Sequence, residues 1–126
     1  MTGATLDSGA LIAFERGSGR MLALVERASR HDLRLAVPAG VVAQTWRGGP
    51  RQARLSRLLG SPCTEVVGLD EVEARAVGVV CGTSGATDVV DVSVVVCARQ
   101  RGHRVVTGDP DDLRATDPGL AVLVPG

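Results

Sequence analysis

Two aspartates, Asp7 and Asp109, each stand after a short apolar segment that we expect to be a β-strand. Asp7 follows Ala4–Leu6, and Asp109 lies just beyond the strand expected at Arg104–Thr107. In a parallel sheet the carboxyl ends of the strands open on one edge, and ligands bind there. The sequence therefore predicts both carboxylates on the same edge of the sheet.

A second pair, Asp88 and Asp91, is spaced three residues apart at the start of an expected helix, so the two share a helix face. If that helix begins at the same edge, three segments of the chain bring carboxylates to one place. Clustered carboxylates raise one another's pKa and destabilise a fold unless a cation joins them. Oxygen ligands suit Mg²⁺ or Mn²⁺, and such an ion activates water and neutralises phosphoryl charge. Zinc is not favoured, because His31 and His103 are isolated.

Each acidic residue also has an ordinary structural interpretation. An aspartate after a strand is often a turn former or a helix cap, and Asp88 can cap its helix and complement the helix dipole. The run from Asp109 to Asp112 can equally be a polar turn, while Asp70 and Asp117 look structural. The spacing of the acids taken together is what favours a metal site.

The composition excludes several classes of protein. All 14 basic residues are Arg and none is Lys, which excludes a Walker-type phosphate loop, a Schiff-base enzyme and the usual receiver domain. The net charge is zero, so no bulk polycation is present to grip nucleic acid. Phe14 and Trp46 are the only aromatic residues, which argues against a base-stacking platform.

The cysteines and the apolar segments bear on location and size. Cys63, Cys81 and Cys97 lack CxxC spacing and are odd in number, so we expect reduced thiols in a cytoplasmic protein. No signal peptide is visible, and no apolar stretch reaches the length of about 18 residues that a membrane span needs. The length fits one domain, residues 1–126.

Short apolar segments alternate with helix-like segments, which predicts an α/β domain with a mostly parallel sheet. Strands are expected at 4–6, 33–37, 63–67, 104–107 and 120–124. Helices are expected at 8–14, 20–29, 38–46, 51–59 and 70–80, and a loop at 82–85. Ser8 and Asp70 are suitable caps for two of these helices.

The segment Thr87–Arg99 is ambiguous. Its many valines favour a strand by propensity. However, it is long, lacks a turn residue, and starts with a Thr cap and an acidic first turn. We therefore expect a buried helix.

Three blocks of the sequence resemble the PIN domain, and more closely the VapC-like toxins of bacterial toxin–antitoxin systems. Leu6–Ala13 (LDSGALIA) resembles the family's first strand and first acid. Asp88–Ala98 (DVVDVSVVVCA) resembles the helix that carries its third acid, and Val105–Leu113 (VVTGDPDDL) the block that carries its fourth. The resemblance covers nearly the whole chain and keeps the blocks in order.

The resemblance implies a three-layer α/β/α sandwich around a parallel sheet of about four to five strands. It also implies a metal-dependent endoribonuclease, with Mg²⁺ or Mn²⁺ held by Asp7, Asp91 and Asp109 and with RNA as the substrate. Asp112 is a second, weaker match to the last acid, and Asp88 is a further candidate. The family's usual partner is a small cognate antitoxin protein, and homodimers are common.

One position departs from the family pattern. The family's second acid sits in the helix after the second strand, where this chain has Gln44, which offers a neutral carbonyl oxygen. Three outcomes stay open: a site with three acids, replacement of the missing charge by Glu15, or a PIN-like module that binds RNA or protein without cutting. The ordinary interpretation of Glu15 is a solvated helix residue. A haloacid-dehalogenase-type phosphatase built on Asp7 is set aside, because Gly9 stands where that family needs a second Asp.

Four arginines gather in one region: Arg47, Arg51, Arg54 and Arg57. The last two share a helix face. The cluster could grip RNA phosphates or an acidic segment of an antitoxin. A solvated face, with the Arg stems covering apolar surface, is the ordinary alternative.

Overall fold

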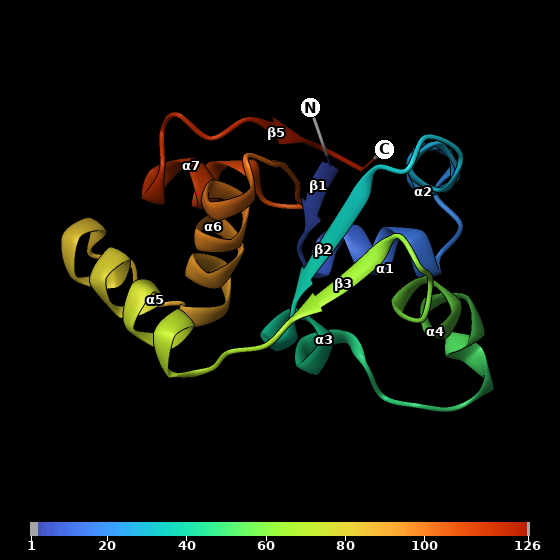
Figure 1. Cartoon of the computed structure of the whole chain (residues 1–126), viewed down its shortest axis with the longest axis horizontal. Helices are drawn as coiled ribbons and strands as arrows, with labels where there is room; N and C mark the ends of the chain where they lie inside the picture. Colours follow the sequence, from blue (N-terminus) through green and yellow to red (C-terminus); the bar gives the residue numbers. More distant parts are fainter. Residues whose placement is uncertain (1–2, 126) are drawn as a thin grey trace.

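A parallel sheet of five strands lies between two groups of helices in the computed structural model of the chain, which describes residues 3–125 (Figure 1). The strands are β1 (Gly3–Leu6), β2 (Arg34–Pro38), β3 (Thr64–Val67), β4 (Arg104–Val106) and β5 (Val122–Leu123). The helices are α1 (Ser8–Glu15), α2 (Gly19–Arg30), α3 (Ala39–Thr45), the 3-10 turn η1 (Pro50–Gln52), α4 (Ala53–Leu59), α5 (Glu71–Ser84), α6 (Val89–Arg101) and α7 (Pro110–Thr116). The predicted three-layer α/β/α sandwich is confirmed.

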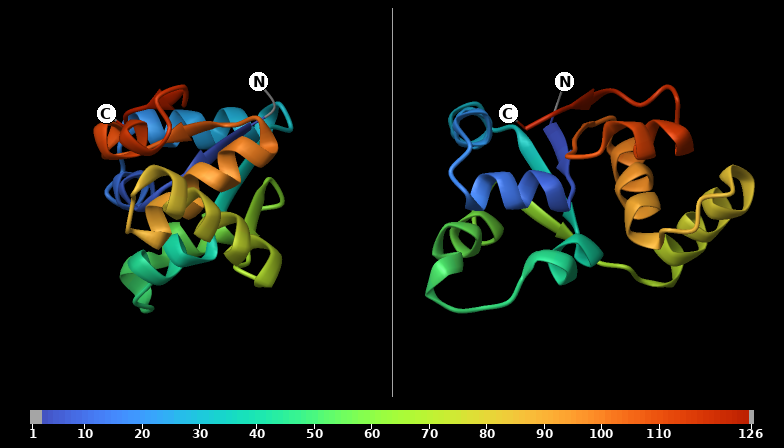
Figure 2. Two further views of the ribbon diagram at one scale, coloured as in Figure 1. Left: turned by 90° about the vertical axis from the view of Figure 1, so that its left-hand side faces the viewer. Right: turned by 180° about the vertical axis from the view of Figure 1, so that it is seen from behind.

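The strand order is β3-β2-β1-β4-β5, and every neighbouring pair is parallel. Helices α1, α2 and α4 cover one face, while α6 crosses the other face with α5 and α7 against it (Figures 1 and 2). Because all strands run the same way, the chain leaves β1, β2 and β4 at one edge of the sheet. That edge receives the residues after each of these strands, Asp7 among them.

Helix α6 is the ambiguous valine-rich segment, and the prediction of a buried helix is confirmed. Every residue from Val92 to Ala98 is buried. Val94, Val95 and Ala98 belong to the main core, whereas Val92 and Val96 pack with Val77 of α5 in a second cluster. Burial on both sides stabilises a helix whose residues individually prefer strands, because tertiary packing outweighs propensity.

Several predicted boundaries were wrong. The loop expected at 82–85 is largely helical, because α5 continues to Ser84 and ends only at Gly85, whose φ of 78° suits glycine. Helix α7 was not predicted at all. It begins at Pro110 with Asp109 as its N-cap, a start that the sequence also allows as a polar turn. The last strand is shorter than expected, covering only Val122–Leu123.

Two further features of the chain are its cysteines and the lengths of its helices. Cys63, Cys81 and Cys97 are all free thiols. Burial raises the pKa of the Cys97 thiol, so this group stays protonated within the core. Among residues 3–125, no single helix is long and apolar enough to cross a membrane.

Candidate functional site

Three aspartates at the carboxyl edge of the sheet are helix N-caps. Asp7 caps α1, and its Oδ1 accepts a hydrogen bond of 2.9 Å from the Ala10 amide. Asp88, rather than the expected Thr87, caps α6. Asp109 caps α7. A carboxylate at an N-cap satisfies an otherwise unpaired amide and complements the helix dipole, so each has a structural reason to be there.

Asp7 is the most enclosed of the three, with 8% of its surface exposed. It caps α1 in place of the predicted Ser8, because the chain turns directly from β1 into the helix. Its own amide donates to the Val106 carbonyl at 3.1 Å, which ties the end of β1 to the end of β4. The block after β4, which contains Asp109, therefore begins beside Asp7.

Two glycines bring the segments after β1 and β4 into close approach. A Cβ atom on Gly9 would lie 2.8 Å from the Gly108 Cα, and one on Gly108 would lie 3.2 Å from the Gly9 Cα. A side chain at Gly9 would therefore meet backbone, which cannot move aside cheaply. This contact also explains why a second Asp, as a dehalogenase-type site requires, has no room at Gly9.

Asp91 stands in the combined field of the other acids. Its pKa is raised from 3.8 to about 6, first by burial and then by the charges of Asp88, Asp112, Asp7 and Asp109. The charges of the four other candidate aspartates thus all act on Asp91, although the five residues come from three segments of the chain. The charges of these aspartates therefore reach Asp91, and their convergence into one metal site stays a prediction.

The two secondary acidic candidates lie on the α5–α7 side of Asp91. Asp88, Asp91 and Asp112 line an open cavity of about 310 Å³ between the end of α5, the start of α6 and α7. Hydrogen bonding and repulsion from Asp109 raise the pKa of Asp112, which is fully exposed. Asp7 and Asp109 do not line this cavity, so only three of the five acids open onto it.

We call the five aspartates Asp7, Asp88, Asp91, Asp109 and Asp112 the acidic edge. Their chemistry suits a hard divalent cation. Their donors are all carboxylate oxygens, which Mg²⁺ and Mn²⁺ prefer, and the raised pKa of Asp91 reports negative charge that a cation would compensate. The side chains are not yet arranged as a coordination shell. Within residues 3–125, no group of three or more His, Cys, Asp or Glu side chains could hold a metal ion as placed. Binding would therefore require side-chain rotation at Asp7, Asp91 or Asp109.

Gln44 and Glu15, the two candidates for a fourth ligand, differ in position. Gln44 is exposed on the last turn of α3. Glu15 lies at the far end of α1 from Asp7, where its carboxylate accepts a hydrogen bond of 2.8 Å from the Gln52 amide group. Glu15 is not among the charges that raise the pKa of Asp91.

Gln52 is a residue that the sequence did not single out. It is buried, and its amide group donates to Glu15 and to the Thr45 carbonyl. Its carbonyl oxygen accepts from the amides of Arg47 and Gly48. One side chain thus holds the turn between α3 and α4 in place. No local pattern in the sequence indicates this role.

The predicted arginine cluster divides into engaged and exposed members. Arg54 is half-buried and donates to the Phe14 and Glu15 carbonyls at 3.4 Å, at the end of α1. Arg47 folds back to the Ala43 and Trp46 carbonyls at the end of α3. These two stabilise helix ends. Arg51 is exposed.

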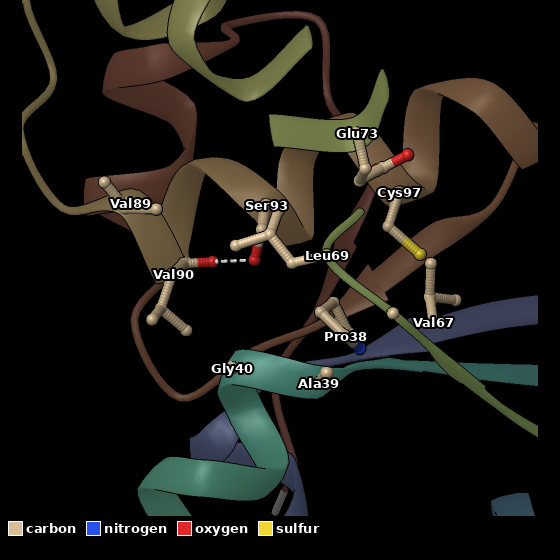
Figure 3. Close-up of a pocket in the computed structure, with 11 residues that line it drawn as sticks. Pro38, Ala39, Gly40, Val67, Leu69, Glu73, Val89, Val90, Ser93 and Cys97 are labelled. Carbon is tan, nitrogen blue, oxygen red and sulfur yellow. Dashed lines mark hydrogen bonds between the residues drawn. The ribbon is translucent and has the colours of Figure 1, made fainter. Parts of the chain in front are cut away.

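A small apolar cavity on another face of α6 is separate from the acids (Figure 3). Val89, Ser93 and Cys97, spaced four residues apart, face it from α6, and the chain from Pro38 to Gly40 closes it below. Its volume is about 30 Å³. Glu73 is the only carboxylate in its lining. We interpret it as a packing gap, since Gly40 meets the Val90 side chain beside it.

Comparison with known proteins identifies the fold. No family model and no curated protein sequence matches the chain. A chain of VapBC2 from Rickettsia felis, solved bound to a DNA fragment from their promoter, superposes with a TM-score of 0.66 at 13% identity, over 96% of this chain and 97% of that chain. This chain has a PIN-like fold.

Two further structures share the PIN-like fold. FitAcB from Neisseria gonorrhoeae gives a TM-score of 0.62 at 20% identity, over 97% of both chains. FitAB bound to an IR36 DNA fragment gives the same TM-score and identity, over 97% of this chain and 94% of that chain. At these sequence identities the likeness establishes the fold alone.

Proposed function

We propose that this protein is a metal-dependent endoribonuclease of the VapC-like toxin type, which hydrolyses RNA phosphodiester bonds with Mg²⁺ or Mn²⁺ held by Asp7, Asp91 and Asp109. The observation that carries the proposal is that the segments after β1 and β4, which hold Asp7 and Asp109, meet at the Gly9–Gly108 contact, and that the charges of both aspartates act on Asp91. Helix capping accounts for Asp7, Asp88 and Asp109 one at a time, but their combined repulsion at Asp91 is unfavourable unless a cation compensates it.

The capping geometry leaves oxygens for a ligand. Asp7 uses Oδ1 for its backbone cap, and no hydrogen bond to its second oxygen is found within residues 3–125, whereas the Asp109 side chain caps α7 and also interacts with Asp112. Asp91 is in the first turn of α6 and makes no cap itself. When bound, a divalent cation lowers the pKa of a coordinated water and neutralises charge on a phosphoryl group. The close contact of Gly9 with Gly108 keeps side chains out of the space beside these carboxylates.

The proposed partners follow from the same fold. The structural neighbours FitAB and VapBC2 are two-component complexes, which supports a cognate antitoxin as the partner of this chain. A homodimer is proposed with it. Of the four predicted arginines, Arg51 and Arg57 are exposed, and no hydrogen bond of either side chain is found among residues 3–125, so these two are the best candidates to contact an RNA phosphate.

The direct test replaces single carboxylates with amides. Asp7→Asn and Asp91→Asn remove charge but keep size, and Asn also serves as an N-cap. We expect Mn²⁺-dependent cleavage of RNA to fall by about a hundredfold or more in each variant, since the metal-holding charge is lost. Gel-based cleavage by purified protein measures this, with circular dichroism to verify folding.

Asp70→Asn is the matched control. Asp70 caps α5 in the same way, with Oδ1 accepting a hydrogen bond of 2.9 Å from the Glu73 amide, but it is not among the charges acting on Asp91. Cleavage should be unchanged in this variant. Full Mn²⁺-dependent cleavage by both Asp7→Asn and Asp91→Asn would refute the proposal.

A second function, a PIN-like module that binds RNA or protein without cutting, is favoured by Gln44. The residue is neutral and exposed where the resemblance implies an acid. Gln44→Glu separates the two functions. If wild-type protein shows no cleavage with Mn²⁺ and Gln44→Glu gains none, the non-catalytic module is supported; cleavage by wild type, increased by Gln44→Glu, supports the nuclease.

A further inference from the structure

An open groove of about 410 Å³ lies between α2 and the outer strands of the sheet, β4 and β5. Its walls come from α2 on one side and from the end of the described chain on the other. The aliphatic residues of its lining are Met21, Ala23, Leu24, Val106, Leu123, Val124 and Pro125. The remaining lining residues are three arginines, Arg20, Arg27 and Arg104, and we call this site the arginine groove.

The sheet register explains the apolar floor of the arginine groove. Val106 of β4 pairs with Leu123 of β5, so their side chains point to the same face of the sheet. Alternation puts Arg104 on that face as well, two residues before Val106. Val106 is buried, Leu123 is half-buried and Val124 is exposed, so the open apolar surface lies at β5 and directly after it.

Within the described part of the chain, the three arginines make no ion pair with a carboxylate. Among residues 3–125, the four ion pairs belong to Arg30, Arg75, Arg99 and Arg101. Arg20 donates a hydrogen bond of 2.8 Å to the Val124 carbonyl across the arginine groove, a contact that leaves its charge uncompensated. No Asp or Glu is in the lining.

We propose that the arginine groove binds an extended peptide segment that alternates acidic and aliphatic side chains. The acidic side chains would pair with Arg27 and Arg104 at the rim, where guanidinium groups form strong bidentate contacts with carboxylates. The aliphatic side chains would cover the open apolar surface of Leu24, Leu123 and Val124, since Met21 and Val106 are already buried. This inference does not depend on the proposed nuclease function.

The lining favours a peptide over RNA as the occupant. A phosphate backbone would satisfy the arginines but would gain nothing from an aliphatic floor. Binding of single-stranded RNA usually adds base stacking on aromatic rings. Phe14 and Trp46, the chain's aromatic residues, are both outside the groove lining.

The test is a titration of ¹⁵N-labelled full-length protein with a synthetic peptide of five Glu-Leu repeats, followed by amide chemical shifts in EDTA. We expect saturable shifts at Met21, Leu24, Val106 and Leu123. The double variant Arg27→Ala/Arg104→Ala should weaken the affinity about tenfold, because two charge-assisted contacts are lost. Arg30→Ala is the matched control on the same helix, since Arg30 pairs with Glu26 outside the groove. It should leave the affinity within about twofold of wild type.

Two further ligands test which chemistry the arginine groove recognises. A peptide of Lys-Leu repeats should not shift these amides, and a ten-nucleotide uridine RNA should not compete with the Glu-Leu peptide there. The proposal is overturned if the Glu-Leu peptide causes no shifts in the groove, if the double variant binds like wild type, or if the RNA displaces the peptide. Asp91→Asn should bind the peptide normally, so failure here is distinct from failure of the nuclease proposal.

Discussion

The acidic edge and the arginine groove are two regions of unbalanced and opposite charge in a chain whose net charge is zero. At the acidic edge, burial and then the charges of four other carboxylates raise the pKa of Asp91. In the arginine groove, three guanidinium groups stand without a carboxylate in the lining. A zero net charge therefore excludes a polycationic surface but says nothing about local sites.

The two regions differ in how the charges are held. Asp7, Asp88 and Asp109 have short side chains held at helix N-caps, and the glycine–glycine contact holds the segments of Asp7 and Asp109 together. The arginine charges are at the ends of long side chains that can extend into solvent. Charge repulsion should therefore cost stability at the acidic edge and very little in the arginine groove.

The largest effect is expected from Gly9→Ala. The new Cβ would lie 2.8 Å from the Gly108 backbone, and relieving this clash must push the segment after β4 away from β1. We expect a loss of about 2–3 kcal/mol in the free energy of unfolding, measured by urea denaturation. Metal-dependent RNA cleavage should fall as well, because Asp109 moves with Gly108.

Gly78→Ala on α5 provides the control for Gly9→Ala. No atom lies within 4 Å of the position of its Cβ, and the residue is within a helix. We expect stabilisation of up to about 1 kcal/mol, as alanine favours helix. Equal losses in the two variants would show that the contact between Gly9 and Gly108 has no special role.

A smaller effect, of opposite sign, is expected from Asp91→Asn. The folded-state pKa of Asp91 is raised from 3.8 to about 6, so the folded protein holds a proton that the unfolded chain has released. Stability from this group is therefore present at low pH and is lost as the pH rises from about 4 to about 6. Since the group is partly exposed, we expect the variant to be more stable than wild type by about 1 kcal/mol near pH 7.5.

The pH dependence is the control for this prediction. Near pH 4 both proteins carry a neutral group at this position, and their unfolding free energies should converge. A constant difference from about pH 4 to about pH 7.5 would show that the gain comes from something other than charge repulsion.

The smallest effect is expected in the arginine groove. Arg27→Ala removes an exposed charge without an ion pair among residues 3–125, so stability should change by less than about 0.5 kcal/mol. Arg54→Ala is the contrast, because it removes the donor to the carbonyls at the end of α1 and should cost about 1 kcal/mol. Thermal unfolding measures both, and a cost for Arg27→Ala as large as that for Arg54→Ala would contradict the distinction between them.

The sequence predicted the sheet, the valine-rich helix and the neighbourhood of the acids because each depends on local patterns. Apolar segments give strands, and the carboxyl ends of parallel strands meet at one edge. The sequence could not show that Asp7 rather than Ser8 caps α1, since both residues suit an N-cap. It also did not separate a polar turn from the start of α7 at Asp109.

The remaining features depend on contacts between distant segments. The approach of Gly9 to Gly108 joins residues 99 positions apart, and no local pattern indicates it. The hydrogen bonds of Gln52 to Glu15 and Thr45 likewise arise only when α1 and α3 pack together. The arginine groove is formed by the register of β4 with β5, a strand whose length was overestimated from the sequence.

Binding of Mn²⁺ tests the central claim most directly, because it needs neither RNA nor a partner. Thermal unfolding would be recorded for wild type, Asp91→Asn and Asp70→Asn with and without MnCl₂. We expect Mn²⁺ at about a hundredfold excess over its Kd to raise the Tm of wild type and Asp70→Asn by about 5–10 °C. Asp91→Asn should gain far less. An unchanged Tm for wild type, or an equal gain in Asp91→Asn, would contradict a metal site at the acidic edge.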